Sequence, residues 1–220
     1  MNSAKQAIVI GGSLGGLFTG NLLRTVGWDV AIYERSAHDL DSRGGGLVLQ
    51  PDVLEVFRRT GVDTAHMDLG VVSQDRTNWG PDGSIKSRTT APQCQTSWSL
   101  IYPTMKARFG DADYHQSKQL VEIQTDPDSK KVTAVFADGT QAFGDLLIGA
   151  DGNGSTVRKL LWPGDEPVYA GYLAWRGLVA ESDVPDAARE LVGNFDFANR
   201  RGQKGGSHMP GHLVPGQGNG

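Results

Sequence analysis

The chain is poor in cysteine and has no cluster of basic residues. Its 220 residues include one cysteine, Cys94, which cannot form an internal disulfide. This favours a reducing compartment, and we expect the cytoplasm. No histidine adjoins Cys94 in the sequence, so the usual partner of a catalytic thiol is missing there. The formal net charge is -4. Without a basic patch, we expect no binding to nucleic acid or to an anionic membrane surface.

One uncharged stretch, residues 7–23, resembles a short membrane span or signal anchor. A span needs at least ~17 apolar residues, so the length is near the lower limit. Four glycines interrupt the stretch, at Gly11, Gly12, Gly15 and Gly16. A strand pattern ends where they begin, and we therefore expect a strand and a turn here and no membrane segment.

Glycine is abundant, with 30 of 220 residues, about twice the usual share of ~7%. Several of these glycines punctuate a β-α-β pattern near the N-terminus. Gln6–Ile10 is an apolar run of the parallel-strand type, and Leu14–Val26 has the apolar face of a helix that Gly27 ends. Asp29–Tyr33 follows as a second strand. Such a unit has a right-handed crossover.

Strands predominate after this unit. The pattern predicts the following elements: a helix at Pro51–Arg59, a strand at Val71–Trp79, a hairpin of Val121–Thr125 and Val132–Ala137, a buried strand at Asp145–Ala150, a helix at Thr156–Leu161, a strand at Tyr169–Ala180 and a helix at Ala187–Phe195. We predict a loop at Gly44–Gly46. The secondary structure of Trp98–Phe109 is ambiguous, because Pro103 interrupts a possible helix. We predict an α/β fold: a Rossmann-like domain with a parallel sheet, interrupted by an antiparallel-sheet domain that is incomplete.

The domain boundaries follow from this order of elements. Residues 1–70 and 110–165 are expected to form the discontinuous Rossmann-like domain. Residues 71–109 and 166–220 are expected to form the partial second domain.

The segment Gly11-Gly12-Ser13-Leu14-Gly15-Gly16 lies between the first strand and the helix. A dinucleotide fingerprint has glycine at its first, third and sixth positions. Gly11 and Gly16 meet this rule, whereas Ser13 occupies the third position. Serine is small, and its hydroxyl could donate to a phosphate oxygen at the positive end of the helix.

Glu34 ends the second strand, 18 residues after Gly16, where a carboxylate can accept hydrogen bonds from an adenosine ribose. The alternative is a glycine-rich turn of an unrelated α/β protein with Glu34 as a surface charge. NAD(P) could fill such a site as well as FAD, and Arg35 would suit a 2′-phosphate.

Later segments decide in favour of flavin. The sequence LLIGADGNGSTVRKLL at residues 146–161 resembles the Asp-Gly motif of the group A FAD-dependent aromatic-ring monooxygenases. GGSLGGLFTGNLLRTVGWDVAIYERS resembles their FAD fingerprint, and GGGLVLQPDVLEVFRRTGV and GYLAWRGLV resemble further segments. The Gly-Gly-Ser variant is most similar to the 2,6-dihydroxypyridine 3-monooxygenase-like branch.

The resemblance assigns cofactor contacts to individual residues. FAD would be held by Gly11, Gly12, Ser13, Leu14, Gly15, Gly16, Glu34, Arg35, Arg43, Asp151 and Gly152. Arg43 would lie close to the cofactor, and Asp151 would contact the flavin ribose region and influence NAD(P)H binding. Asp151 could instead be a turn or helix-capping residue. Arg158 would either serve the same site or pair with a surface carboxylate.

The resemblance also implies a reaction. The family uses NAD(P)H and O2 to hydroxylate a small aromatic or N-heterocyclic substrate, in catabolic or secondary-metabolite pathways, and a homodimer is compatible with it. The cofactor carries this chemistry, so we assign no catalytic side chain. We expect no metal, because a proline and a glycine between His208 and His212 exclude a regular helix.

Two features depart from the family. After Trp98 the family has an arginine that reaches the FAD phosphates, and here Lys106 and Arg108 stand out of register. A later Gly-Asp motif for the ribityl and phosphate side is absent from these 220 residues. We therefore expect a C-terminally truncated member that hydroxylates poorly by itself. The alternative is a non-catalytic FAD- or nucleotide-binding remnant.

Overall fold

A computed structural model gives the fold. It describes residues 4–40, 45–80, 82, 84–171, 180–186, 195–199 and 207–208. The chain divides into two compact units, which are described separately. The first comprises Met1–Ser42, Glu55–Asp63 and Ile101–Val168. The second comprises Arg43–Leu54, Thr64–Leu100 and Tyr169–Gly220.

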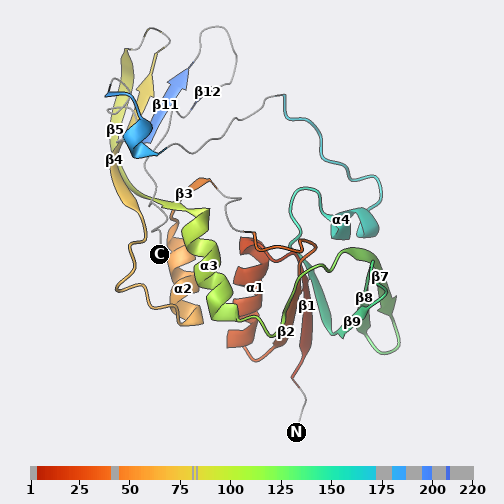
Figure 1. The fold of residues 1–220 in the computed structure, drawn as a ribbon. Coiled ribbons are helices and arrows are strands. Elements are labelled where there is room, and N and C mark those ends of the chain that lie inside the picture. The colour runs from red at the N-terminus through yellow and green to blue at the C-terminus, as the bar shows by residue number, and fades with distance from the viewer. Residues whose placement is uncertain are drawn as a thin grey trace. The chain divides into compact units, whose positions relative to one another are not determined.

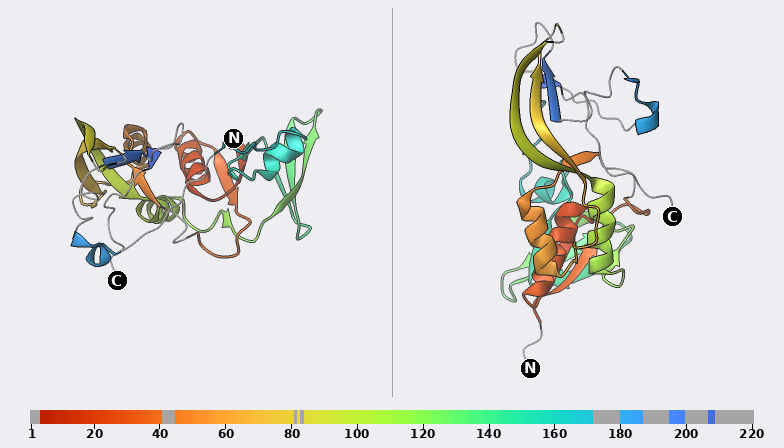
Figure 2. Two further views of the ribbon diagram at one scale, coloured as in Figure 1. Left: turned by 90° about the horizontal axis from the view of Figure 1, so that it is seen from above. Right: turned by 90° about the vertical axis from the view of Figure 1, so that its left-hand side faces the viewer.

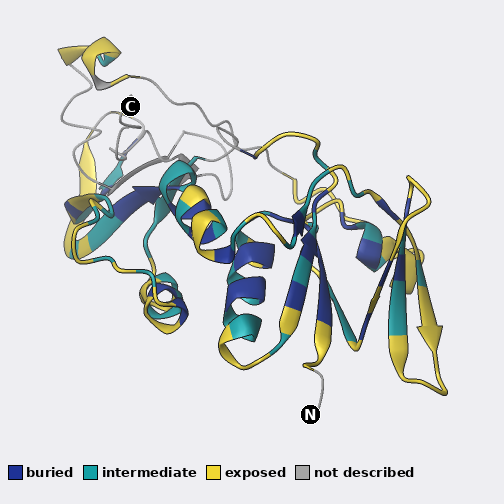
Figure 3. Cartoon of the chain, turned by 60° about the horizontal axis from the view of Figure 1, so that its bottom comes forward, coloured by how far each residue is buried: buried dark blue, intermediate teal, exposed yellow. Residues whose placement is uncertain are grey.

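A parallel sheet forms the centre of the first unit (Figure 1). Its order is β10-β1-β2-β6, with β1 at Gln6–Ile10, β2 at Asp29–Tyr33, β6 at Tyr114–His115 and β10 at Leu146–Gly149. Helix α1, Leu14–Thr25, connects β1 to β2. The β-α-β unit therefore forms where the apolar runs and Gly27 predict it. Residues of β1 and one side of α1 are buried (Figure 3).

Helix α3, Trp98–Phe109, packs against α1 within the first unit. A Cβ at Gly20 of α1 would lie 2.9 Å from Cε2 of Phe109, so the two helices approach closely. Asn21 of α1 donates to the carbonyl of Met105 at 3.1 Å. The segment left open by Pro103 is thus a continuous helix, whose buried residues include Ile101, Tyr102, Met105 and Phe109.

A three-stranded antiparallel sheet covers the other side of β1. It consists of β7 at Leu120–Asp126, β8 at Lys131–Phe136 and β9 at Gln141–Gly144. Its apolar side chains form one core with β1 and the short helix α4, Thr156–Leu161. The core consists of Ile8, Ile10, Leu120, Ala134, Phe136, Ala142 and Val157. The sequence predicts the first two strands and misses the third.

The second unit contains a sheet of order β12-β11-β4-β5-β3. Its strands are β3 at Gly46–Val48, β4 at Val71–Trp79, β5 at Ile85–Ser97, β11 at Phe195–Asn199 and β12 at Ser207–His208. Strands β4 and β5 form a long antiparallel pair, visible from two sides in Figure 2. Helix α2, Pro51–Thr60, and a 3-10 turn, Glu181–Asp183, complete the described elements.

The structure confirms the α/β class, with one parallel sheet and one antiparallel sheet in the first unit. The sheet of the second unit is antiparallel except for the parallel pair of β11 and β4. Three local expectations are wrong. Gly46 belongs to β3 because it pairs with Ser97 of β5, residues 169–171 are not in a strand, and Phe195 begins β11 instead of ending a helix. The rest of the segments expected at 169–180 and 187–195 lies largely outside the described residues. The expected domain boundaries stay a prediction. No helix in the described ranges is long and apolar enough to cross a membrane.

Candidate functional site

The glycine-rich turn lies at the carboxyl ends of three parallel strands. The N–H of Gly11 donates to the carbonyl of Tyr33, at the end of β2, at 2.9 Å. Beside it, the N–H of Ala150, which follows β10, donates to the carbonyl of Ile10 at 2.7 Å. Ligands of open parallel sheets bind at this edge, outside the carboxyl ends of the strands.

At two glycines of the turn, backbone atoms leave no room for a side chain. Gly11 has a φ of 104°, and a Cβ there would lie 2.4 Å from the carbonyl oxygen of Ala150. A Cβ at Gly16 would lie 1.9 Å from the carbonyl oxygen of Gly11. The first and sixth positions of the fingerprint are therefore glycine because backbone atoms occupy the space of any Cβ.

The N-terminus of α1 is open to an anion. Ser13 is the N-cap residue, with extended backbone, and its side chain does not cap the helix. The N–H of Leu17 donates to the carbonyl of Ser13 at 2.9 Å, so the earlier amides have no partner inside the helix. The first turn carries no acidic residue. Free amides and the helix dipole together favour a phosphate group here.

Glu34 lies against this turn although 22 residues separate it from Gly12. Its side chain is buried, with 7% exposed. Oε2 accepts from the N–H of Gly12 at 2.8 Å, and Oε1 accepts from the N–H of Ser36 at 2.9 Å. A carboxylate oxygen can accept more than one hydrogen bond, so both oxygens keep acceptor capacity. Arg35 beside it is exposed, and Arg43 lies outside the described residues.

Asp151 caps α4. Its Oδ1 accepts from the Ser155 hydroxyl at 2.5 Å, and its Oδ2 accepts from the N–H groups of Thr156 at 2.6 Å and Val157 at 3.2 Å. Ser155 is the N-cap residue of α4, and its Oγ accepts from the N–H of Arg158 at 3.0 Å. The hydrogen bonds of Asp151 are therefore those of a helix-capping residue, which was the alternative interpretation. A contact between Asp151 and the cofactor stays a prediction. Gly152 follows with a φ of 78°.

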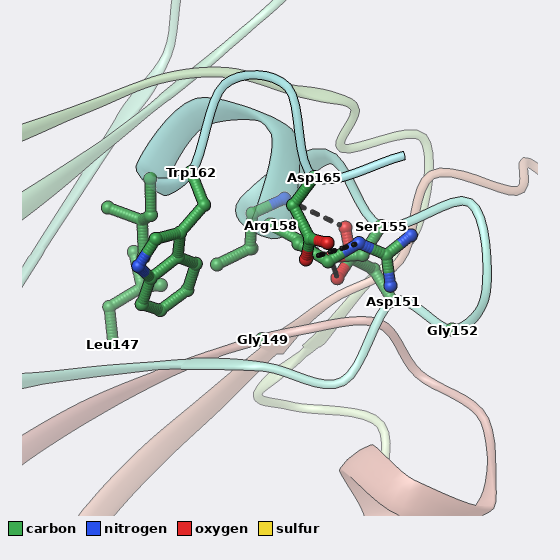
Figure 4. A pocket seen from close by; sticks show the side chains of 10 residues that line it. Leu147, Gly149, Asp151, Gly152, Ser155, Arg158, Trp162 and Asp165 are labelled. Carbon is green, nitrogen blue, oxygen red and sulfur yellow. Dashed lines mark hydrogen bonds and ion pairs between the residues drawn. The ribbon is translucent and has the colours of Figure 1, made fainter. Parts of the chain in front are cut away.

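A pocket of about 730 Å³ lies beside this cap (Figure 4). It is lined by Leu147, Gly149, Asp151, Gly152, Ser155, Val157, Arg158, Leu161, Trp162 and Asp165. Arg158 donates to the carbonyl of Asn153 at 2.5 Å, and its Nε lies 3.9 Å from a carboxylate oxygen of Asp165. Asp165 is thus a possible partner for Arg158 in a surface ion pair, although this distance is at the outer limit for such a pair.

The two basic residues of α3 are engaged by groups of the protein. The ammonium of Lys106 lies 3.0 Å from Asp39 and 3.2 Å from Asp111. The guanidinium of Arg108 donates to the carbonyl of Thr60. Lys106 is thus paired with two carboxylates, and Arg108 is held by a backbone carbonyl.

Tyr114 is a residue of this site that the sequence pattern does not indicate. Its hydroxyl donates to the carbonyl of Gly12 at 2.9 Å and lies 3.3 Å from the hydroxyl of Tyr102. Tyr114 lies in a two-residue strand, 102 residues after Gly12. No local motif marks such a position, and only the pairing of β6 with β2 brings it to the turn.

Metal and thiol chemistry find no support in the described part of the chain. No group of three His, Cys, Asp or Glu residues there could hold a metal ion. The side chain of His208 and all of His212 lie outside it. Burial raises the pKa of the Cys94 thiol, and Asp68 adds to this, so the reactive thiolate is disfavoured.

The comparisons with known proteins agree with this arrangement. The chain is 35% identical over 211 residues to 2,6-dihydroxypyridine 3-monooxygenase of Paenarthrobacter nicotinovorans, covering 96% of this chain and 51% of the relative. It is 31% identical to the aurachin C monooxygenase/isomerase of Stigmatella aurantiaca, covering 86% of this chain and 50% of that one.

A solved structure shares the fold. The 2,6-dihydroxypyridine-3-hydroxylase of Arthrobacter nicotinovorans superposes with a TM-score of 0.82 at 33% identity, covering 98% of this chain and 53% of that one. The chain thus spans about half the length of these relatives. The family described as FAD binding domain matches residues 4–211. With its open helix N-terminus and buried Glu34 at the carboxyl edge of a parallel sheet, the chain belongs to the FAD binding domain family.

Proposed function

We propose that the turn between β1 and α1 holds the ADP half of FAD. We further propose that the protein is an FAD-dependent monooxygenase, which hydroxylates a small aromatic or N-heterocyclic substrate with NAD(P)H and O2. The observation that carries the proposal is the turn itself. An uncapped helix N-terminus and a buried carboxylate, Glu34, meet there at one edge of the sheet.

The diphosphate side of the proposed site rests on α1. The amides of Leu14, Gly15 and Gly16 are in its first turn, without acceptors inside the helix. The Ser13 hydroxyl, which makes no cap hydrogen bond, adds a donor at the position where the fingerprint has glycine. These groups fit a diphosphate, since an anion gains from each N–H and from the helix dipole.

The ribose side rests on Glu34. Its two oxygens each accept one backbone hydrogen bond, and the remaining lone pairs can accept from two adjacent ribose hydroxyls. Arg35 is exposed beside it and would contribute at the rim. We retain Arg43, Asp151 and Gly152 as proposed contacts to the rest of the cofactor, on the strength of the family resemblance.

The relatives support the substrate class by their names, which specify a dihydroxypyridine and, for an enzyme of Streptomyces cremeus at 30% identity, an amino-hydroxybenzoate. Bound FAD would supply the redox chemistry. The described residues of this chain would bind and orient its ADP half. The single cysteine, Cys94, agrees with a reducing cytoplasm, which we propose as the location.

The binding step is tested on the purified chain. We expect a flavin absorption spectrum, and titration of the flavin-free protein with FAD and separately with ADP should show binding of both ligands. A protein that binds neither contradicts the proposed site.

The catalytic step needs a second assay. NADH or NADPH oxidation is followed on hydroxypyridines and hydroxybenzoates, and hydroxylated product and hydrogen peroxide are measured together. Substrate-dependent product supports the monooxygenase. If the chain binds FAD but hydrogen peroxide is the only product, the result would support the alternative hypothesis, a cofactor-binding remnant that does not hydroxylate by itself.

A further inference from the structure

The peptide groups on both sides of Gly12 are held by side chains from distant elements. On one side, the N–H of Gly12 donates to Oε2 of Glu34 at 2.8 Å. On the other side, the carbonyl of Gly12 accepts from the hydroxyl of Tyr114 at 2.9 Å. Both contacts are buried. The turn therefore has little freedom to rotate about Gly12.

The direction of the hydrogen bonds around Tyr114 follows from chemistry. A carbonyl oxygen has no proton, so Tyr114 must donate to Gly12. Its oxygen is then free to accept from the hydroxyl of Tyr102 of α3, 3.3 Å away. Burial is the largest cause that raises the pKa of the Tyr114 phenol far above its usual value. The phenol thus stays protonated and remains a donor.

Tyr114 also explains why position 12 is glycine. A Cβ at Gly12 would lie 2.2 Å from Oη and 2.6 Å from Cζ of Tyr114. Gly12 is not among the glycines with positive φ, so the backbone conformation alone does not require glycine there. The ring of Tyr114, fixed among buried neighbours with 7% exposed, takes the space.

We propose that Tyr114 is a positioning residue for the cofactor turn. A trans peptide points its carbonyl and its N–H in opposite directions. By holding the Gly12 carbonyl, Tyr114 turns the N–H of Ser13, which belongs to the same peptide group, away from itself. The hydroxyl thereby pre-organises the donors that face the diphosphate. This inference rests on the proposed function of the turn.

The test removes the hydroxyl and keeps the ring. Tyr114→Phe loses the bond to Gly12, whereas Tyr102→Phe loses only the contact between the two hydroxyls. We expect Tyr114→Phe to weaken binding of FAD and of ADP by the same factor, about 3- to 10-fold, as for one neutral hydrogen bond. Tyr102→Phe should weaken both less. Affinities are measured by calorimetry well below each melting temperature, so that lost stability alone does not change them.

A second arm tests the steric relation. Gly12→Ala should lower the melting temperature of the wild-type protein. The same change should cost less in the Tyr114→Ala background, because the space for the Cβ is then free. Additive losses would contradict the clash.

The outcomes separate the two proposals. Wild-type protein that binds neither FAD nor ADP contradicts the proposed function, and the role of Tyr114 with it. Wild-type protein that binds both, together with Tyr114→Phe of unchanged affinity and lower melting temperature, contradicts only the positioning role and leaves Tyr114 as a core residue.

Discussion

The carboxylate of Glu34 accepts a hydrogen bond of 2.8 Å from the backbone N–H of Gly12. This contact joins the end of β2 to the loop that follows β1, and the parallel pairing of Ile10 with Tyr33 brings the two segments together. Glu34 therefore supports the shape of the turn in addition to its proposed contact with ribose. A change at Glu34 should affect both the turn and the ligand.

Glu34→Ala should weaken FAD binding by about 1.5–3 kcal/mol, because ribose hydroxyls and the Gly12 amide lose a charged acceptor. Glu34→Gln should fall between wild type and alanine, since an amide offers one acceptor oxygen instead of two. Glu122→Ala, an exposed change elsewhere in the same unit, is the matched control. Equal FAD affinity of Glu34→Ala and wild type in a fluorescence titration would refute the ribose assignment.

Gly16→Val should damage folding and flavin binding together. Its Cβ would lie 1.9 Å from the carbonyl oxygen of Gly11, and α1 would have to move away from β1. Gly15→Ala is the control for stability, because its Cβ would meet only the Cβ of Ala150 at 3.9 Å. Alanine also favours helix, so this variant should melt at or above the wild-type temperature. A wild-type melting curve for Gly16→Val would show that the close approach is not needed.

Arg24 should be a stabilising residue of the first unit. Its guanidinium donates to the carbonyls of Phe109 at 2.6 Å and Val30 at 3.0 Å and pairs with Asp113 at 2.6 Å. It also lies 3.7 Å from the centre of the Phe109 ring. We expect Arg24→Ala to lower the free energy of unfolding by about 2–4 kcal/mol, because several partly buried acceptors lose their donor.

The control for Arg24 is Arg59→Ala, which removes an exposed guanidinium paired with Glu55 inside α2. Such a surface pair contributes about 0–1 kcal/mol. Urea denaturation of both variants gives the comparison. A loss for Arg24→Ala no larger than that for Arg59→Ala would count against the role of Arg24.

Glu55 should contribute to stability only above acidic pH. Hydrogen bonds from Arg58 and then Arg59 lower its pKa from the ordinary 4.5 to about 2. A lowered pKa in the folded state stabilises the protein above the unfolded value, and the contribution disappears as the pH falls from 4.5 toward 2. Glu55→Gln should thus melt slightly below wild type at neutral pH, and the two melting temperatures should converge in acid. The effect is small because the Glu55 side chain is 41% exposed and water screens the ion pairs.

Melting temperatures between pH 2 and 7 check this, with Glu166→Gln, another exposed carboxylate, as the control. A gap between Glu55→Gln and wild type that stays constant over the whole range would disprove the linkage.

The local elements of the β-α-β unit and the residue types of its turn can be predicted from the amino-acid sequence. Strands Gln6–Ile10 and Asp29–Tyr33 form over the residues expected from their apolar runs. The helix between them ends at Thr25, one residue before the expected end, where Gly27 takes a positive φ of 86°. These features depend on side-chain periodicity and backbone freedom within a few residues, which a linear sequence shows directly.

The contacts between groups that are distant in the sequence become visible only in the folded chain. Because of Pro103, the sequence pattern does not decide whether Trp98–Phe109 is a helix. In the structure this segment is a continuous helix, with Ile101, Tyr102 and Met105 buried in the core. Tyr114 reaches Gly12 across 102 residues because a two-residue strand pairs with β2. A hydrogen bond of this kind has no periodicity and no spacing rule. It depends on which strand edge a short segment joins, and burial of apolar surface over the whole unit selects that edge.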